Sequence, residues 1–342
     1  MDYYDGTKLL SMVDINNQPP GLYLTTSNRS AGKTTFFNRY CVKKFIKNKE
    51  KFMVLFRYKY ELFDVAEKFF SEIKNLFFPN LEMTSKMQAK GLYAELYLNE
   101  ISCGYAVALN SSDMLRKNSH LFADTQRILF DEFQAESNVY LSNEINKFLS
   151  LYTSVARGGG KQSRNVPVYM LSNNVNVLNP YFVELGISER LKSNTKYLRG
   201  NGFVLELGFN QAASIALKSN NVLKAFQTAY NDYASNGTFL YDDTAFIEKI
   251  NGTNRYIATL KFDGEFYAIR EYPQHNIVYC DDRIDDTFNY RVAVTTDDHQ
   301  AGFVRANSND FMVKCFRDYF NYGNFRFKNI KCKKAILNYL KY

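Results

Sequence analysis

The chain has 342 residues, of which 46% are hydrophobic and 16% aromatic, so it is long enough for two domains with substantial cores. Its formal net charge of +8 favours a polyanionic partner such as nucleic acid. The five singly scattered cysteines exclude a disulfide framework and a zinc site, and the sequence has neither an apolar signal region nor an apolar run near the ~20 residues that span a bilayer. We therefore expect a soluble protein of a reducing cytoplasm, with no membrane partner.

The first predicted elements flank a phosphate-binding loop. Residues 21–26 predict a strand, and the residues after Lys33 predict a helix with one apolar face. Between them, residues 27–34 read Ser-Asn-Arg-Ser-Ala-Gly-Lys-Thr, with serine in place of the usual first glycine. Backbone N–H groups of such a loop face phosphate oxygens. The sequence thus predicts a site for ATP and Mg²⁺, with these nucleotide contacts: Ser27, Asn28, Arg29, Ser30, Ala31, Gly32, Lys33, Thr34 and Thr35.

A pair of acids follows a later strand. Residues 52–56 predict a second strand, a helix follows it, and residues 92–108 predict a hairpin. The strand at 127–130 then ends in Asp131 and Glu132. We expect Asp131 and the Thr34 hydroxyl to hold magnesium, and Glu132 to orient the attacking water. Two carboxylates after a buried strand are ordinary by themselves, but together with a phosphate loop they predict an ATPase.

Two further features belong to the same predicted site. A strand at 166–171 ends in Ser172 and Asn173, and a polar strand tip beside paired acids indicates the additional-strand, catalytic-glutamate class of P-loop ATPases. We expect both side chains to contact the attacking water or the γ-phosphate, although Ser and Asn also favour turns. Arg157 ends a predicted helix before three glycines and is a candidate arginine finger for a neighbouring subunit. Arg164 is the alternative, and either arginine also suits a helix C-terminus.

The remaining residues change in character. Residues 210–233 predict helix, and from about 244 the pattern is β, with a hairpin around Asp263 and Gly264. Two C-terminal helices complete the chain. The predicted domains are an α/β ATPase domain at 1–204, a small helical linker at 205–243 and an α+β domain at 244–342.

Four short segments carry a resemblance to a known family: Phe-Arg-Tyr-Lys at 56–59, Phe-Asp-Glu-Phe at 130–133, Leu-Ser-Asn at 171–173 and Asn-Pro-Tyr-Phe at 179–182. With them the chain resembles the small DNA-packaging ATPases of short-tailed, picovirus-type phages whose genomes end in terminal proteins, which are relatives of terminase large subunits. The resemblance implies a homopentameric ring that drives double-stranded DNA into a prohead, docked beneath the portal through a packaging RNA. It places the protein in the host cytoplasm and transiently at the portal vertex, and not in the mature virion.

The resemblance also implies roles for particular residues. It assigns phosphate binding and catalysis to Lys33, phosphate sensing to Arg29, a finger acting in trans to Arg157, and DNA contacts to Arg57 and Lys59. For the C-terminal domain it implies an RNase H-like fold with a vestigial nuclease. We expect no cleavage activity, because the available acids are turn residues or solvated loop charges: Asp263, Asp281, Asp282, Asp297 and Asp298.

The C-terminal segment from 305 to 342 has nine Lys or Arg residues against two Asp, with Phe325, Phe327 and Tyr339 between them. This mixture favours contact with RNA or DNA, although an amphipathic helix with a lysine-rich face has the same pattern. Two alternative functions remain at this point. One is a P-loop helicase or AAA-type remodeller, and the other is an ATP-gated nucleic-acid-binding switch without translocation.

Overall fold

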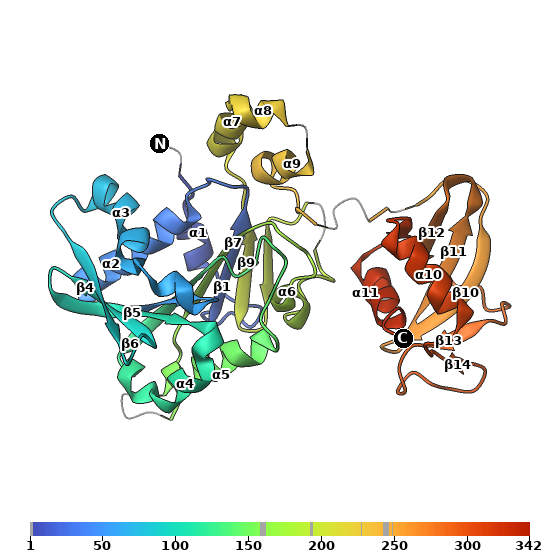
Figure 1. The fold of residues 1–342 in the computed structure, drawn as a ribbon, viewed down its shortest axis with the longest axis horizontal. Helices are drawn as coiled ribbons and strands as arrows, with labels where there is room; N and C mark the ends of the chain where they lie inside the picture. Colours follow the sequence, from blue (N-terminus) through green and yellow to red (C-terminus); the bar gives the residue numbers. More distant parts are fainter. Residues whose placement is uncertain (1–2, 158–161, 192–193, 227, 242–245, 248) are drawn as a thin grey trace. The chain divides into compact units, whose positions relative to one another are not determined.

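In the computed structural model the chain forms two compact units, residues 1–187 with 191–241 and residues 188–190 with 242–342 (Figure 1). The structure describes residues 3–157, 162–191, 194–226, 228–241, 246–247 and 249–342. Within these residues, no helix has both the length and the apolar character needed to cross a membrane. Each unit contains one β-sheet with its own core, so each is described separately.

The first unit is built on a sheet of nine strands in the order β3-β4-β5-β2-β6-β7-β1-β9-β8. The six central strands, from β5 to β9, are parallel, and antiparallel strands complete both edges. Strand β7 lies between β1 and β6, an order that agrees with the additional-strand class predicted from the paired acids and the polar strand tip. The bounds are β1 (Leu22–Ser27), β2 (Lys51–Phe56), β3 (Met83–Gln88), β4 (Tyr93–Leu98), β5 (Ile101–Ala108), β6 (Thr125–Asp131), β7 (Val168–Asn173), β8 (Tyr197–Gly200) and β9 (Phe203–Leu207).

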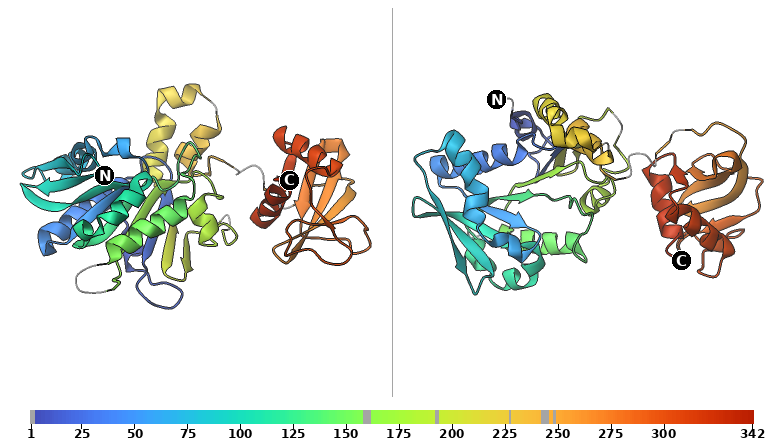
Figure 2. Two further views of the ribbon diagram at one scale, coloured as in Figure 1. Left: turned by 60° about the horizontal axis from the view of Figure 1, so that its bottom comes forward. Right: turned by 45° about the horizontal axis from the view of Figure 1, so that its top comes forward.

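Helices cover both faces of this sheet (Figure 2). Alternate residues of β7 belong to different apolar clusters, Met170 to one and Tyr169 to the other, as the two-residue period of a buried strand requires. The cluster with Tyr169 also contains the apolar faces of α2 and α3, and the cluster with Met170 contains that of α5. The helices are α1 (Thr7–Ser11), α2 (Lys33–Asn48), α3 (Val65–Phe77), α4 (Ser112–Lys117), α5 (Glu144–Ala156) and α6 (Pro180–Glu184), with the 3₁₀ turns η1 (Lys59–Leu62), η2 (Leu109–Ser111) and η3 (Ser119–Phe122).

The expected helix at 210–233 is three short helices, α7 (Gln211–Ser219), α8 (Asn221–Ala225) and α9 (Ala229–Asn236). The break follows from Asn220, whose side chain accepts hydrogen bonds from the N–H groups of Val222 and Leu223 and so starts a new helix. This segment packs with the first unit. Asn28 of the phosphate loop exchanges two hydrogen bonds with the backbone of Asn210, just before α7.

The second unit contains a six-stranded sheet in the order β14-β13-β10-β11-β12-β15. Strands β10, β11 and β12 form an antiparallel meander, and β13 pairs in parallel with β10, an arrangement that matches the expected RNase H-like fold. Asp263 and Gly264 have φ values of +55° and +77°, which confirms the tight hairpin turn. The bounds are β10 (Arg255–Phe262), β11 (Glu265–Tyr272), the 3₁₀ turn η5 (Pro273–His275), β12 (Ile277–Asp281), β13 (Arg291–Ala293), β14 (Val304–Arg305), α10 (Phe311–Asn321), β15 (Phe325–Phe327) and α11 (Ile330–Tyr339).

The core of this unit corrects one sequence-based prediction. Phe325, Phe327 and Tyr339, which were expected to contact nucleic acid, are at most 3% exposed and belong to the apolar cluster between the sheet and the two helices. The alternate positions of β15 and the apolar face of α11 account for their spacing. These rings are therefore core residues, and only the basic side chains of the segment remain as candidates for nucleic-acid contact.

Candidate active site

The phosphate loop connects the end of β1 to the start of α2, as predicted. Gly32 caps α2 with a φ of +91°, a conformation that favours glycine. Ser27, the serine in place of the usual first glycine, is the last residue of β1. The residue with a positive φ is Ser30, at +56°. The backbone strain of the altered loop therefore lies at Ser30, next to the residues that would face phosphate.

Lys33 lies under the loop with only 6% of its surface exposed. Its ammonium group donates to the hydroxyl of Ser27 at 2.7 Å and to Asn173 Oδ1 at 3.2 Å. The serine in the first glycine position therefore provides an acceptor for the lysine. The neighbouring Ser172 hydroxyl is buried and has no hydrogen-bond partner among the described residues. The tip of β7 thus meets the loop as predicted, with one polar atom available to an incoming group.

Burial lowers the pKa of Lys33 to about 8, with a further contribution from Arg29 and an opposing one from Asp131. A bound triphosphate favours the charged lysine and raises this pKa. At a pH where Lys33 of the free protein is deprotonated, binding of ATP therefore takes up a proton. We expect the affinity for ATP to be constant below about pH 8 and to fall up to about tenfold per pH unit above it. Calorimetric titration between about pH 6.5 and 9.5 measures this profile.

The control for this profile is Lys33→Arg, because a guanidinium stays charged throughout the range. Its affinity is expected to be independent of pH across the same interval. A flat profile in the wild-type protein would show that Lys33 does not titrate in the free site.

Thr34 and Asp131 form the expected magnesium pair. The Thr34 hydroxyl donates to Asp131 Oδ2 at 2.8 Å, while Oδ1 accepts from the backbone N–H of Glu132 at 2.9 Å. Burial raises the pKa of the Asp131 carboxyl. The two hydrogen bonds that it accepts and the positive charge of the nearby Lys33 oppose that shift. Two adjacent oxygen ligands fit Mg²⁺, which usually takes one or two protein ligands and keeps several waters. The residues present therefore suit the metal that an ATPase requires.

Glu132 is exposed beside this pair and has a left-handed backbone, with a φ of +53°. The carboxyl is exposed at the cavity but partly withdrawn from water, which raises its pKa; the nearby Asp131 and Glu136 raise it further, and Arg29 and Arg57 oppose the shift. The backbone carbonyl of Glu132 accepts a hydrogen bond from the Arg57 guanidinium at 3.1 Å, and the carbonyl of Phe133 accepts another at 2.7 Å. The unusual backbone of the expected catalytic acid is therefore held by Arg57.

This geometry contradicts the predicted DNA contact of Arg57. Its side chain is 7% exposed and pairs at 3.1 Å with Glu144, whose side chain is 1% exposed. Tyr181 also donates to Glu144, at 3.0 Å. Removing one partner of such a buried pair leaves an unpaired charge, so Arg57 is committed to the interior. Lys59, the other expected DNA contact, is exposed on η1.

Arg29 extends from the loop toward α9. Its guanidinium bonds the carboxylate of Glu136 at 2.6 and 2.8 Å and the hydroxyl of Tyr230 at 2.7 Å. Its backbone N–H donates to the carbonyl of Ala234 at 3.0 Å. The expected phosphate-sensing arginine thus connects the loop, the segment after β6 and the helices α7–α9.

The two candidate finger arginines occupy the far end of α5. Because β6 and β7 are parallel, α5 runs back to the sheet edge opposite the phosphate loop, where Arg157 follows its last residue. Arg157 is exposed there and does not line the phosphate cavity of this chain. Arg164 donates from its side chain to the carbonyl of Val155 and from its backbone to that of Ala156, both at 3.0 Å. Arg164 therefore has the helix-capping role, and the glycines at 158–160 lie outside the described residues.

Residues 29–35, both acids and the tip of β7 line one cavity of about 430 Å³. Ser27 and Asn28, which were also expected to contact the nucleotide, are buried and do not line it. Two further residues line it that sequence reasoning missed, Tyr3 and Glu72. Glu72, on α3, accepts a hydrogen bond from the hydroxyl of Thr35 at 2.9 Å. Neither residue belongs to a motif, and no feature of the sequence pattern points to their position in the site.

The strand order and this loop–acid geometry define a P-loop ATPase fold of the additional-strand, catalytic-glutamate class. The family model described as podovirus DNA encapsidation protein (Gp16) matches residues 1–341, so the chain belongs to this family of viral DNA-packaging proteins. The resemblance predicted from the sequence is thereby confirmed.

The individual relatives share about a quarter of their residues with this chain. The DNA packaging protein of Bacillus phage B103 is 24% identical over 306 residues, 88% of this chain and 90% of that protein. That of Bacillus phage phi29 is 24% identical over 332 residues, 96% and 93% of the two chains. A solved chain of the bacteriophage Phi-29 viral genome packaging motor assembly matches all of this chain and 98% of its own, with a TM-score of 0.63 at 22% identity. A chain of the Phi-28 gp11 DNA packaging motor matches with a TM-score of 0.58 at 16% identity, covering 99% and 97%. These structures share the fold.

Proposed function

We propose that this chain is a packaging motor that hydrolyses ATP and thereby moves double-stranded DNA into a prohead. The observation that carries the proposal is that Lys33, Thr34, Asp131 and Glu132 meet at one edge of a parallel sheet, in one cavity of a chain of the DNA encapsidation family. Sequence reasoning left a helicase and an ATP-gated switch as alternatives. No feature of the site favours either over the packaging motor.

The chemistry requires little beyond positioning and charge. The backbone N–H groups of the loop and the N-terminus of α2 face the phosphates, and Lys33 reaches the outer ones. Magnesium bound at Thr34 and Asp131 would neutralise charge that develops on the β- and γ-phosphates. Glu132 orients a water for in-line attack and accepts its proton, while Ser172 and Asn173 hydrogen-bond the water or the γ-phosphate. The raised pKa of Glu132 suits a group that takes up a proton.

The position of Arg157 supports a ring-shaped oligomer of this chain. Because this arginine is exposed at the edge opposite its own phosphate site, it can complete a site only in another subunit. A closed ring of identical subunits provides that contact at every interface. We propose a homopentamer that is docked on the portal through a packaging RNA. The basic side chains of residues 305–342 are the candidates for nucleic-acid contact in the second unit.

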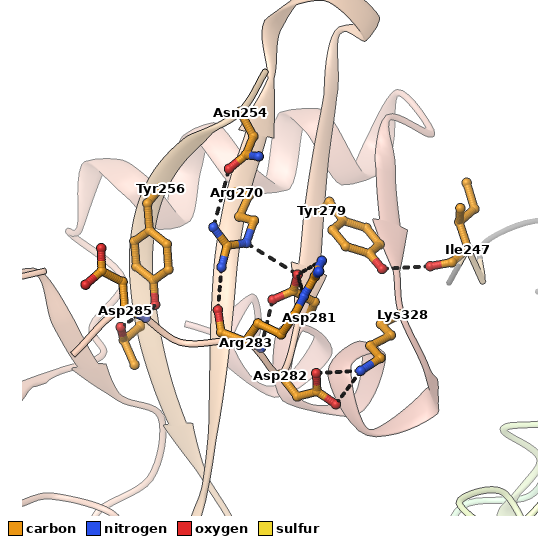
Figure 3. Close-up of polar contacts among 11 residues, drawn as sticks. Ile247, Asn254, Tyr256, Arg270, Tyr279, Asp281, Asp282, Arg283, Asp285 and Lys328 are labelled. Atoms are coloured by element: carbon orange, nitrogen blue, oxygen red, sulfur yellow. Dashed lines mark hydrogen bonds and ion pairs between the residues drawn. The ribbon is translucent and has the colours of Figure 1, made fainter. Parts of the chain in front are cut away.

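The contacts of the candidate acids in the second unit support the proposal that this chain has no nuclease activity. Asp281, which was expected to be solvated, is buried at the end of β12, and it pairs with Arg270 at 3.3 Å and with Arg283 at 2.9 Å. Figure 3 shows both arginines directed at this carboxylate. Asp282 pairs with Lys328 at 2.6 Å. Asp298 is buried too, and its carboxylate accepts hydrogen bonds from the backbone N–H groups of Asp263 and Gly264 in the hairpin turn. Asp263 and Asp297 are exposed, as expected.

A two-metal nuclease needs several acids that converge. Among the residues that the structure describes, no three or more Asp, Glu, His or Cys side chains form a group that could hold a metal ion. We therefore expect the purified protein to leave supercoiled plasmid intact in the presence of Mg²⁺ or Mn²⁺, as measured on agarose gels. Metal-dependent nicking that is lost in Asp281→Asn or Asp297→Asn would contradict this expectation.

The motor proposal is tested by ATP turnover with and without DNA. We expect long double-stranded DNA to stimulate hydrolysis and added salt to weaken the stimulation. Lys59→Ala is expected to lower the stimulated rate and to leave the basal rate unchanged, because Lys59 is exposed and outside the phosphate cavity. The matched control is Lys218→Ala on α7.

Three outcomes would contradict these expectations. Equal loss of basal and stimulated turnover in Lys59→Ala would place Lys59 in the catalytic machinery instead. A preference for forked or single-stranded DNA would favour a helicase. Turnover that ignores DNA altogether would favour a switch.

A further inference from the structure

A second cavity adjoins the phosphate site. It has a volume of about 690 Å³ and lies among the N-terminal segment, α1, α2 and α3, which are neighbours in Figure 1. Tyr3 lines both cavities. Its ring lies against Gly32, where an added Cβ would come within 2.7 Å of the ring. The two cavities therefore meet at the phosphate loop, with Tyr3 between them.

The walls of this cavity are largely aromatic, and their charged residues are Arg39, Lys43 and the acidic Asp5. Arg39 lies over the ring of Phe77, with 4.0 Å between the guanidinium carbon and the ring centroid. Its Nε atom is buried and has no hydrogen-bond partner among the described residues, and Lys43 also lines the cavity. The aromatic lining residues are Tyr3, Tyr4, Phe36, Tyr40 and Phe77. The cavity thus offers ring faces for stacking and a donor that lacks an acceptor.

The position of the cavity suits the far end of a nucleotide. The outer phosphates belong at Lys33 and the metal at Thr34, and the second cavity adjoins this site at Tyr3. The next positions of α2 include Phe36, Arg39 and Tyr40, which line the second cavity. Aromatic faces stack on any base, and the ring nitrogens of a purine are acceptors for an arginine donor.

We propose that this cavity binds the base of the nucleotide, with Tyr3 as a stacking face and Arg39 as a donor to a ring nitrogen of a purine. The inference rests on the proposed ATP hydrolysis. It adds residues that distinguish a nucleotide from a bare triphosphate. Tyr3 lies against Gly32 and lines both cavities, so it is at the junction between the phosphate site and the proposed base site.

The test compares ATP with inorganic tripolyphosphate, both with Mg²⁺, by calorimetric titration of the full chain. We expect the wild-type protein to bind ATP at least about tenfold more tightly than tripolyphosphate. Tyr3→Ala and, independently, Arg39→Met are expected to weaken ATP about fivefold or more. Arg39 does not line the phosphate cavity, so Arg39→Met should leave the affinity for tripolyphosphate within about twofold of wild type. The control is Tyr322→Ala, which removes a tyrosine that is 80% exposed in the second unit and should change neither affinity.

The outcomes separate this inference from the proposed function. Equal affinities of the wild-type protein for ATP and tripolyphosphate would overturn the base site and leave the phosphate site intact. An Arg39→Met variant that weakens both ligands equally, or neither, would overturn the base site in the same way, as would a Tyr3→Ala variant that binds ATP as tightly as the wild-type protein. Failure of the wild-type protein to bind either ligand would contradict the proposed ATPase, and this inference with it.

Discussion

Glu132→Ala is expected to bind ATP with unchanged affinity and to hydrolyse it at least about 10²-fold more slowly than the wild-type protein. The carboxylate of Glu132 is exposed beside Asp131 and is free to contact water, whereas the phosphate contacts come from the loop and Lys33. Removing it therefore removes the proton acceptor without removing the binding site. Single-turnover phosphate release, measured alongside equilibrium binding of ATP, separates the two effects.

The control for this variant is Glu184→Ala, an exposed glutamate at the end of α6 that should change neither binding nor turnover. Normal turnover in Glu132→Ala would reassign the catalytic acid. Loss of binding together with turnover would instead show that Glu132 holds the nucleotide or its metal.

Arg157→Ala is expected to lower turnover by about 10³-fold or more when every subunit carries the change, because an arginine finger stabilises the charge of the transferring phosphoryl group. Mixing it with Lys33→Ala should restore part of the activity. In such rings an Arg157→Ala subunit supplies an intact nucleotide pocket and its Lys33→Ala neighbour supplies the arginine. Steady-state turnover as a function of the mixing ratio measures this complementation.

Arg164→Ala is the matched control, because Arg164 caps the end of α5. We expect that variant to lose thermal stability and to retain turnover in the folded fraction. Absence of complementation between Arg157→Ala and Lys33→Ala would contradict the role of Arg157 in trans. It would favour Arg164 or a finger within the same subunit.

The features that could be predicted from the sequence are local ones. The phosphate loop, the strand that ends in Asp131 and the hairpin at Asp263 each depend on residues that are adjacent in the chain. The polar tip at Asn173 was also predictable, because parallel strands bring their carboxyl ends to one sheet edge. Its hydrogen bond with Lys33 confirms that it meets the loop.

The features that could not be predicted depend on partners far apart in sequence. Arg57 looks like an exposed cation after a strand, but its partner Glu144 is 87 residues away. Tyr339 fits both a nucleic-acid contact and a core position, and only the packing of α11 on the sheet decides for the core. Tyr3 and Arg39 belong to no motif, and the cavity that they line arises only when the N-terminal segment packs beside α2.

The most direct test of the account is a crystal structure of the protein with Mg²⁺ and a nonhydrolysable ATP analogue. The account predicts the β- and γ-phosphates within the loop of residues 27–34, the metal between Thr34 and Asp131, and a water positioned by Glu132. A nucleotide bound elsewhere, or a loop that stays empty at saturating analogue, would contradict the central claim that this loop and these acids form the site of ATP hydrolysis.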